Sequence, residues 1–226
     1  MKALLEYRDV WLIGGGGKTT LMYRLAAAWA ERGESALCTT TTRIWPPTPD
    51  QCPDFRTGAL TAVRADLRAR PASRVTVASR VEGGKCQGFS ADEALALTEE
   101  ARHVVVEADG SAGRPLKAHA PHEPVVAAGA SCVVAVVGGW SVGAPLDAEH
   151  VHRPERFSAL TGRKLGEPVT AADVARAILD DQGWERAVPQ SAVFRVVVTG
   201  EDRGIGDALA EHPKAWRLAG MLVLPP

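Results

Sequence analysis

Short runs of aliphatic residues alternate along the chain with longer alanine-rich segments. Several of the short runs are apolar at every position, which is typical of parallel-sheet strands buried on both faces. The pattern predicts strands at residues 10–13, 36–39, 75–78, 104–107, 133–137, 194–199 and 221–224. Because helical segments separate these strands, we expect an α/β protein of three layers, with a mostly parallel sheet covered by helices.

The segments between the strands have helical periodicity, most clearly at residues 19–32, 90–101 and 170–182. The apolar face of the first helix consists of Leu21, Met22, Leu25 and Trp29. Residues 45–53 contain too many prolines for a helix or a central strand, which predicts a surface loop. No internal repeat or low-complexity linker divides the chain, so residues 1–226 are predicted to form a single domain.

Length and charge limit the classes of function. The chain has 226 residues, and its 26 lysines and arginines against 27 acidic residues give a formal net charge of −1. A domain of this length buries about 70 to 75% of its unfolded surface, so it needs no metal or disulfide to fold. The near-neutral charge argues against general nucleic-acid binding. The four cysteines are scattered without a C-x-x-C pair, which predicts reduced thiols.

The location of the protein is predicted from its apolar runs. None of them approaches the roughly 18 to 20 residues that span a bilayer, so we expect no membrane association. Glu6, Arg8 and Asp9 interrupt the apolar N-terminal segment, and no small-residue cleavage site of a secretory signal follows. We therefore expect a cytoplasmic protein.

A glycine-rich segment, WLIGGGGKTTL, lies between the first predicted strand and the first predicted helix. Glycines can adopt positive φ and turn successive amides toward an anion, and the helix adds amides at its positive end. Lys18 can neutralise β- and γ-phosphate oxygens, and Thr19 can bind Mg²⁺. A glycine-rich turn that only joins strand to helix is the alternative. The residues predicted to bind the phosphates are Gly14, Gly15, Gly16, Gly17, Lys18, Thr19 and Thr20.

Four threonines, 39 to 42, follow the second predicted strand. Hydroxyls at the carboxyl end of a strand beside a phosphate loop can reach Mg²⁺ or the γ-phosphate. Thr41 and Thr42 are the better candidates because they lie nearest the loop. For Thr39 and Thr40, the strand propensity of threonine explains the sequence equally well.

Two carboxylates follow the valines of HVVVEADGS. Residues two apart on a strand point the same way, so Glu107 and Asp109 would both face the ligand edge if the strand continued to Asp109. We expect Asp109 to hold Mg²⁺, and Glu107 to orient or deprotonate a nucleophile. With Lys18 they are the predicted catalytic residues.

Two later segments, PLKAHAPHEP and EHVHRPERF, carry further charged residues. The prolines of the first exclude the helix that an H-E-x-x-H metal site requires. We expect this loop to deliver Lys117, His122 and Glu123 to an anionic substrate or to the transferred phosphoryl group. In the second segment, His152 and Arg153, with Arg156, form a basic cluster that can hold phosphate, or simply the start of a solvated helix.

Together GGGGKTT, TTTTRIW, EADGS, PLKAHAPHEP and VHRPERF, in this order over about two-thirds of the chain, resemble the YqeC family. These are accessory proteins of selenium-dependent molybdenum hydroxylases. The resemblance implies a P-loop NTPase-like fold, ATP or GTP with Mg²⁺ as cofactors, and a role in maturing a molybdenum hydroxylase or its cofactor. It also implies that the hydroxylase or the proteins that mature its cofactor are partners.

The resemblance carries particular roles over to this sequence. It implies phosphate binding at residues 14–20, and Mg²⁺ or catalytic roles at Thr41, Glu107 and Asp109. Thr199 and Gly200 stand where related sequences often have an N-K-x-D-like base-recognition element. The sequence therefore leaves open which nucleotide base the protein prefers. The family positions without an assigned role are Lys117, His122, Glu123, His152 and Arg153.

The leading functional hypothesis is a Mg²⁺-dependent nucleoside-triphosphate hydrolase or phosphotransferase that serves the maturation of a molybdenum enzyme. One alternative is a nucleotide-gated carrier or chaperone with little turnover, in which nucleotide orders the loop at residues 41–53. The other alternative is a small-molecule kinase whose acceptor is held by Lys117, His122 and Arg153.

Overall fold

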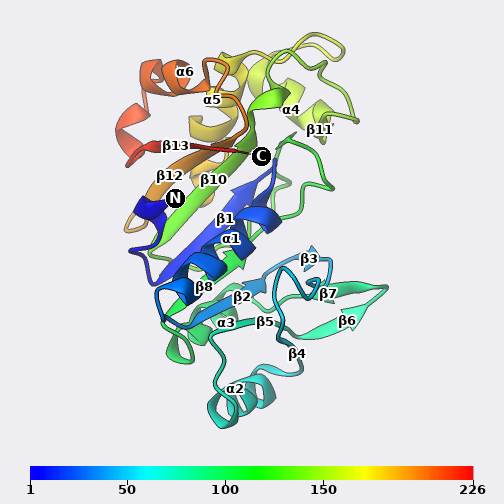
Figure 1. Cartoon of the computed structure of the whole chain (residues 1–226). Coiled ribbons are helices and arrows are strands. Elements are labelled where there is room, and N and C mark those ends of the chain that lie inside the picture. Colours follow the sequence, from blue (N-terminus) through cyan, green and yellow to red (C-terminus); the bar gives the residue numbers. More distant parts are fainter. Residues whose placement is uncertain (226) are drawn as a thin grey trace. The chain divides into compact units, whose positions relative to one another are not determined.

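The structure is a computed structural model that describes residues 1–225 (Figure 1). Eight strands form the main sheet, in the order β13-β12-β10-β1-β8-β2-β5-β4, and helices flank it. The predicted α/β class with a mostly parallel sheet is therefore confirmed. The strands of the main sheet are β1 (Asp9–Gly14), β2 (Ala36–Thr40), β4 (Phe55–Thr57), β5 (Arg74–Ala78), β8 (His103–Glu107), β10 (Cys132–Gly138), β12 (Val193–Thr199) and β13 (Met221–Leu224).

The helices and the shorter strands complete the fold. The short strands are β3 (Arg43–Ile44), β6 (Arg80–Glu82) and β7 (Lys85–Gln87), which form an antiparallel sheet, and β9 (Leu116–Lys117) and β11 (Val151–His152), which form a parallel pair. The helices are α1 (Lys18–Glu31), α2 (Leu60–Ala69), α3 (Ala91–Ala96), α4 (Pro154–Thr161), α5 (Ala171–Leu179) and α6 (Ile205–Glu211). No helix within residues 1–225 is both long and apolar enough to cross a membrane.

Sequence and structure agree closely on the long elements. Every predicted strand is present with its ends moved by at most one residue, and the first predicted helix begins and ends one residue earlier. The helix predicted at 90–101 is shorter, because α3 ends at Ala96 and a 3-10 turn, Leu97–Glu99, follows. Ser90 caps α3 by accepting a hydrogen bond from the amide of Glu93, whose side chain binds back to Ser90.

The chain divides into two compact units. Unit 1 contains Met1–Leu12, Thr19–Gly110 and Val125–Cys132. Unit 2 contains Ile13–Lys18, Ser111–Pro124 and the chain from Val133 onward. The predicted single domain stays a prediction, because the compactness of each unit does not establish whether the two fold together.

Unit 1 contains the parallel strands β1, β8, β2, β5 and β4. The apolar face predicted for α1 is buried here. Trp29 of α1 stacks on His103, with ring centroids 4.6 Å apart and planes inclined by 4°, and its indole N–H donates to the carbonyl of Leu5. These contacts attach the C-terminal half of α1 to the start of β8.

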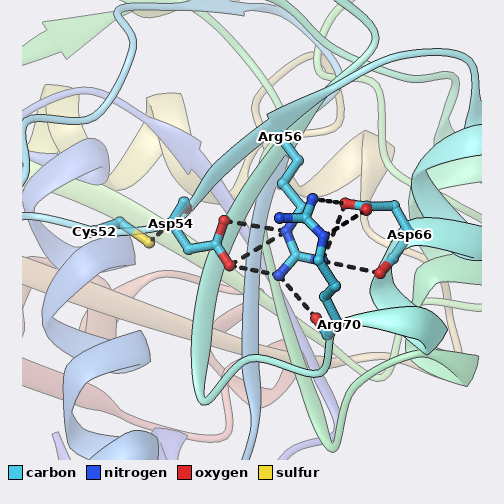
Figure 2. Close-up of polar contacts among 5 residues, drawn as sticks. All are labelled: Cys52, Asp54, Arg56, Asp66 and Arg70. Carbon is cyan, nitrogen blue, oxygen red and sulfur yellow. Dashed lines mark hydrogen bonds and ion pairs between the residues drawn. The ribbon is translucent and has the colours of Figure 1, made fainter.

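Arg56 on β4 joins this edge of the sheet to the C-terminal end of α2 (Figure 2). Its guanidinium binds both carboxylate oxygens of Asp54, the closest at 2.5 Å, and lies 3.2 Å from a carboxylate oxygen of Asp66. It also donates to the carbonyls of Asp66 and Arg70, at 3.2 and 2.8 Å. A cation at a helix C-terminus satisfies terminal carbonyls and interacts favourably with the helix dipole. Arg56 is therefore the attachment point of α2.

Unit 2 is built on β10, β12 and β13, with α5 packed against α4 and α6 (Figure 1). Its largest buried side chains are aromatic, namely Trp184, Phe157 and Phe194. The four cysteines of the chain are all buried, and no disulfide is found within residues 1–225, which agrees with the prediction of reduced thiols. Burial raises the pKa of Cys38 and Cys86.

We predict that Arg56→Met lowers the free energy of unfolding by about 2 kcal/mol, because several hydrogen bonds to a charged group are lost. Asp54 and Asp66 are each about one-third exposed, so water partly replaces the guanidinium. Urea unfolding of the parent and the variant measures the difference. Arg80→Gln is the matched control, since its exposed ion pair with Glu82 contributes less than about 0.5 kcal/mol. Equal losses in both variants would contradict the assignment.

Candidate functional site

The glycine-rich loop between β1 and α1 requires glycine for a reason other than ligand binding. Gly14, Gly16 and Gly17 have positive φ, at 96, 70 and 108°. A Cβ on Gly14 would lie 2.4 Å from the Trp184 ring, and one on Gly16 would lie 2.1 Å from the Gly138 amide nitrogen. Protein atoms of unit 2 therefore fill the space beside these two glycines.

The first half of the loop is also hydrogen-bonded within unit 2. The amide of Gly15 donates to the carbonyl of Val136 at 2.8 Å, and the amide of Gly16 donates to the carbonyl of Arg114 at 3.1 Å. The hydroxyl of Thr199 donates to the carbonyl of Gly16 at 2.6 Å. The amides of Gly15 and Gly16 are thus used by the protein in this conformation.

The second half of the loop differs in exposure. Gly17 is exposed, and among residues 1–225 no acceptor is found for its amide. Lys18 is only 3% exposed, and its ammonium donates to the carbonyl of Gly14 at 2.5 Å. Thr19 and Thr20 follow in the first turn of α1, where amides have no partner inside the helix. Residues 17–20 therefore combine an exposed glycine with the N-terminal turn of a helix.

In unit 1, the hydroxyl of Thr19 donates to a carboxylate oxygen of Glu107 at 2.7 Å. Glu107 is the last residue of β8, as predicted, so the condition for both carboxylates to face the ligand edge, a strand that continues to Asp109, is not met. The alternation of a strand therefore does not determine where Asp109 points. Asp109 is nevertheless buried, at 1% exposure. Glu107 is thus the carboxylate that lies beside Thr19.

The threonines at the end of β2 and just after it mainly donate hydrogen bonds to backbone carbonyls. The hydroxyl of Thr40 and the amide of Thr41 both donate to the carbonyl of Glu107, at 2.7 and 3.1 Å. The hydroxyl of Thr39 donates to Val77, which supports the structural interpretation of Thr39 and Thr40. The hydroxyl of Thr41 donates to the carbonyl of Val125, and its oxygen lone pairs remain available to a ligand.

Unit 2 brings the two later segments together. β9 and β11 pair in parallel, so that Lys117 lies beside His152. A carboxylate oxygen of Glu123 lies 3.0 Å from the ammonium of Lys117 and 2.5 Å from the guanidinium of Arg153, and it accepts the amide of Ala120 at 3.3 Å. We call Lys117, Glu123 and Arg153 the charged cluster. Its three members are predicted site residues.

The charged cluster is largely closed to water. Lys117 is fully buried, and the Glu123 side chain is 13% exposed. Burial acts to raise the pKa of Glu123, but the hydrogen bond from Arg153 and the charge of Lys117 outweigh it and lower the pKa to about 2. Burial, with the charges of Arg153 and Lys117, lowers the pKa of His152, so this imidazole is neutral at pH 7. The charged cluster together with His152 accordingly carries a net charge of about +1.

His122 does not join the charged cluster. It is exposed, and no hydrogen bond or ion pair of its side chain is found within residues 1–225. Arg153 is the N-cap of α4, with a φ of 66°, and its guanidinium is bound to Glu123. No three His, Cys, Asp or Glu gather as a metal site in the described part of the chain.

Three residues with a role here escaped sequence reasoning. Thr199 braces the glycine-rich loop, and Trp184 packs against Gly14 while its indole N–H donates to the carbonyl of Lys117 at 3.2 Å. Arg186 donates to the carbonyls of Ala120 and Glu123. All three lie far along the chain from their partners, and no local spacing signals such contacts.

The fold and the site define an α/β protein in which a glycine-rich loop with a buried lysine joins the first strand to the first helix. Residues 10–155 match the family model described as "YqeC protein". The chain is also 35% identical over 181 residues to a protein of Escherichia coli (strain K12) called "Uncharacterized protein YqeC". That alignment covers 79% of this chain and 70% of the relative. The chain belongs to the YqeC family, as the resemblance predicted.

The family match covers the glycine-rich loop, Thr19, Glu107, Asp109 and the charged cluster. It ends at residue 155, so Trp184, Arg186 and Thr199 lie beyond it. The residues that brace the site from the C-terminal part of unit 2 are therefore outside the segment that the family model matches.

We predict that Glu123→Gln lowers the free energy of unfolding at pH 7 by about 3 kcal/mol, the value of a pKa lowered from 4.5 to about 2. A depressed pKa in the folded state gives stability that is present above the unfolded pKa. This difference between parent and variant should shrink as the pH falls from about 5 to about 2. Urea unfolding across this pH range measures it.

Glu149→Gln is the control, because Glu149 is an exposed carboxylate of the same unit. It should change stability by less than about 0.5 kcal/mol at every pH. A difference for Glu123→Gln that stayed constant down to pH 2 would show that lost packing, and not charge, is responsible.

Proposed function

We propose that this chain is a Mg²⁺-dependent nucleoside-triphosphate-binding protein that acts as an NTPase or phosphotransferase. The observation that carries the proposal is the 2.7 Å hydrogen bond between the Thr19 hydroxyl and the Glu107 carboxylate. A hydroxyl in the first turn after a glycine-lysine loop, and a carboxylate at the end of a neighbouring strand, are the two protein groups that hold Mg²⁺ in P-loop NTPases.

The donor chemistry fits this ion. Mg²⁺ in nucleotide sites takes only one or two protein oxygens and completes its shell with phosphate oxygens and water. The hydroxyl oxygen of Thr19 and a carboxylate oxygen of Glu107 supply that number. Bound Mg²⁺ would neutralise charge on the phosphates. Thr41 is a further oxygen donor for this shell.

The phosphates would bind at residues 17–20. The amide of Gly17 has no acceptor among residues 1–225, and the positive end of a 14-residue helix favours an anion there. Residues 14–16 fix the first half of the loop within unit 2 through the amides of Gly15 and Gly16. Lys18 would exchange its bond to the carbonyl of Gly14 for bonds to the β- and γ-phosphates.

Because Thr19 bonds to Glu107, we propose the reverse of the roles that the sequence suggested for Glu107 and Asp109. We assign Glu107 to the metal ion. Asp109, two residues further and buried, is assigned to the attacking group, a water or an acceptor hydroxyl, whose proton it would accept or orient. Both residues belong to unit 1, as does Thr19.

Service to a molybdenum hydroxylase or its cofactor rests on the family resemblance. The bonds within the loop favour one particular form of this role, in which nucleotide rearranges the loop and thereby gates a partner. Its test is the affinity of the chain for the hydroxylase, measured with and without Mg-ATP. Equal affinities would remove the gating role and leave nucleotide binding untouched.

We predict that Lys18→Ala weakens the binding of Mg-ATP and Mg-GTP by about 10- to 100-fold, because hydrogen bonds to a charged group are lost. Calorimetric titration of parent and variant measures the change, and phosphate release measures turnover. Lys164→Ala is the control, since Lys164 is exposed. A Lys18→Ala protein that bound and turned over nucleotide like the parent would refute the proposal.

We predict that substitutions of Glu107 and Asp109 have different effects on ATP affinity and on turnover in the same assays. Glu107→Gln is expected to remove the part of ATP affinity that depends on Mg²⁺ and to leave binding in EDTA unchanged. Asp109→Asn should keep the Mg²⁺-dependent affinity and lose turnover by about 100-fold or more. The reverse pattern would restore the division of roles expected from the sequence.

A further inference from the structure

A cavity of about 570 Å³ lies within unit 2, apart from the glycine-rich loop. It is lined by residues 118–121, by α4 and by the segment that follows α5, and we call it the α4–α5 cavity. We propose that the α4–α5 cavity binds a small molecule that carries a phosphate or carboxylate group. Its volume is in the range of about 300 to 1,000 Å³ that small-molecule sites occupy.

The balance of charge at the cavity favours an anion. Of the two acidic residues of its lining, Asp181 is paired with Lys214 outside the cavity, and Asp180 lies 3.0 Å from Nε2 of His212. The lysine partner also lowers the pKa of Asp181. With the charge of Asp181 balanced by Lys214, two arginines of the lining face one further carboxylate, that of Asp180.

The two arginines of the lining have no carboxylate partner. No hydrogen bond or ion pair of the Arg156 side chain is found within residues 1–225, and this residue is exposed. Arg186 uses one nitrogen, Nη2, for the carbonyls of Ala120 and Glu123, at 2.9 and 3.1 Å. Guanidinium groups bind phosphate and carboxylate through two nitrogens at once, and both arginines retain donors for this.

The remaining lining is partly aliphatic and rests on buried rings. Leu160 of α4 adds aliphatic surface. Trp184 is fully buried, and its N–H is used by the carbonyl of Lys117, so it supports this part of the wall and presents no surface to a ligand. The ring of His119 lies against the indole, with centroids 5.5 Å apart and planes inclined by 49°.

The charged cluster explains how the cavity keeps its shape. Lys117 and Glu123 lie at the two ends of the segment that contributes Ala118, His119 and Pro121 to the lining, and Glu123 binds both Lys117 and Arg153. Arg186 ties the same segment at Ala120. The three charged residues therefore position a wall of the cavity. None of residues 14–20 lines it, so the inference does not depend on the nucleotide site.

The test uses two probes on a Lys18→Ala background, in which the proposed nucleotide site is weakened. AMP carries a phosphate on a planar base, and nicotinate carries a carboxylate on a planar ring. Each is titrated calorimetrically into the full chain up to millimolar concentration. We expect saturable binding of at least one probe, and which probe binds distinguishes phosphate from carboxylate.

Substitutions then locate the binding site. Arg156→Gln and Arg186→Gln should each raise the Kd about tenfold, the change expected when one charge-assisted hydrogen bond is lost. Lys164→Gln removes the same charge from an exposed residue outside the cavity and should leave the Kd unchanged. Arg156 is exposed, so its variant remains informative even if Arg186→Gln disturbs the loop.

Two outcomes would overturn the inference. One is the absence of saturable binding of both probes, and the other is binding that Arg156→Gln leaves unchanged or that Lys164→Gln weakens equally. Because Lys18 is already replaced, neither outcome bears on nucleotide binding, which is tested separately in the parent.

Discussion

A buried ammonium group has to be neutralised where it lies, and in unit 2 this requirement falls on Glu123. Lys117 has no exposure to water, and an isolated charge in such a place costs several kcal/mol. Glu123 neutralises the ammonium and also binds Arg153, the N-cap residue of α4. One carboxylate thus fastens β9, the 118–123 segment and the start of α4 to one another. The position of the cavity wall follows from the same contacts.

The long elements could be predicted from the sequence because each has its own local signal. The valine runs of β8 and β10 are buried on both faces, and the apolar face of α1 is visible in its spacing. The short strands β3, β6 and β7 gave no such signal, since each is only two or three residues long. The end of β8 at Glu107 was predicted as well, but where Asp109 points was not, because the alternation of a strand does not extend beyond Glu107.

The candidate site was predicted as a set of residues, but their partners were not. Lys117, Glu123 and Arg153 were chosen for their charge, whereas their pairing depends on the β9–β11 contact between segments about 35 residues apart. The same holds for Arg56, whose carbonyl acceptors at the end of α2 follow from the tertiary fold. Thr199 reaches the loop across 183 positions, which no spacing rule anticipates.

The packing of Gly14 and Gly16 changes what the glycine run can tell us about relatives. A side chain at either position would collide with Trp184 or with the backbone at Gly138, whether or not the protein ever meets a nucleotide. A descendant that had lost nucleotide binding would still retain these glycines to preserve its interior. The run is therefore a poor diagnostic of activity across the family, and under the proposed function Lys18, Thr19 and Glu107 are the positions whose divergence would mark a change of function.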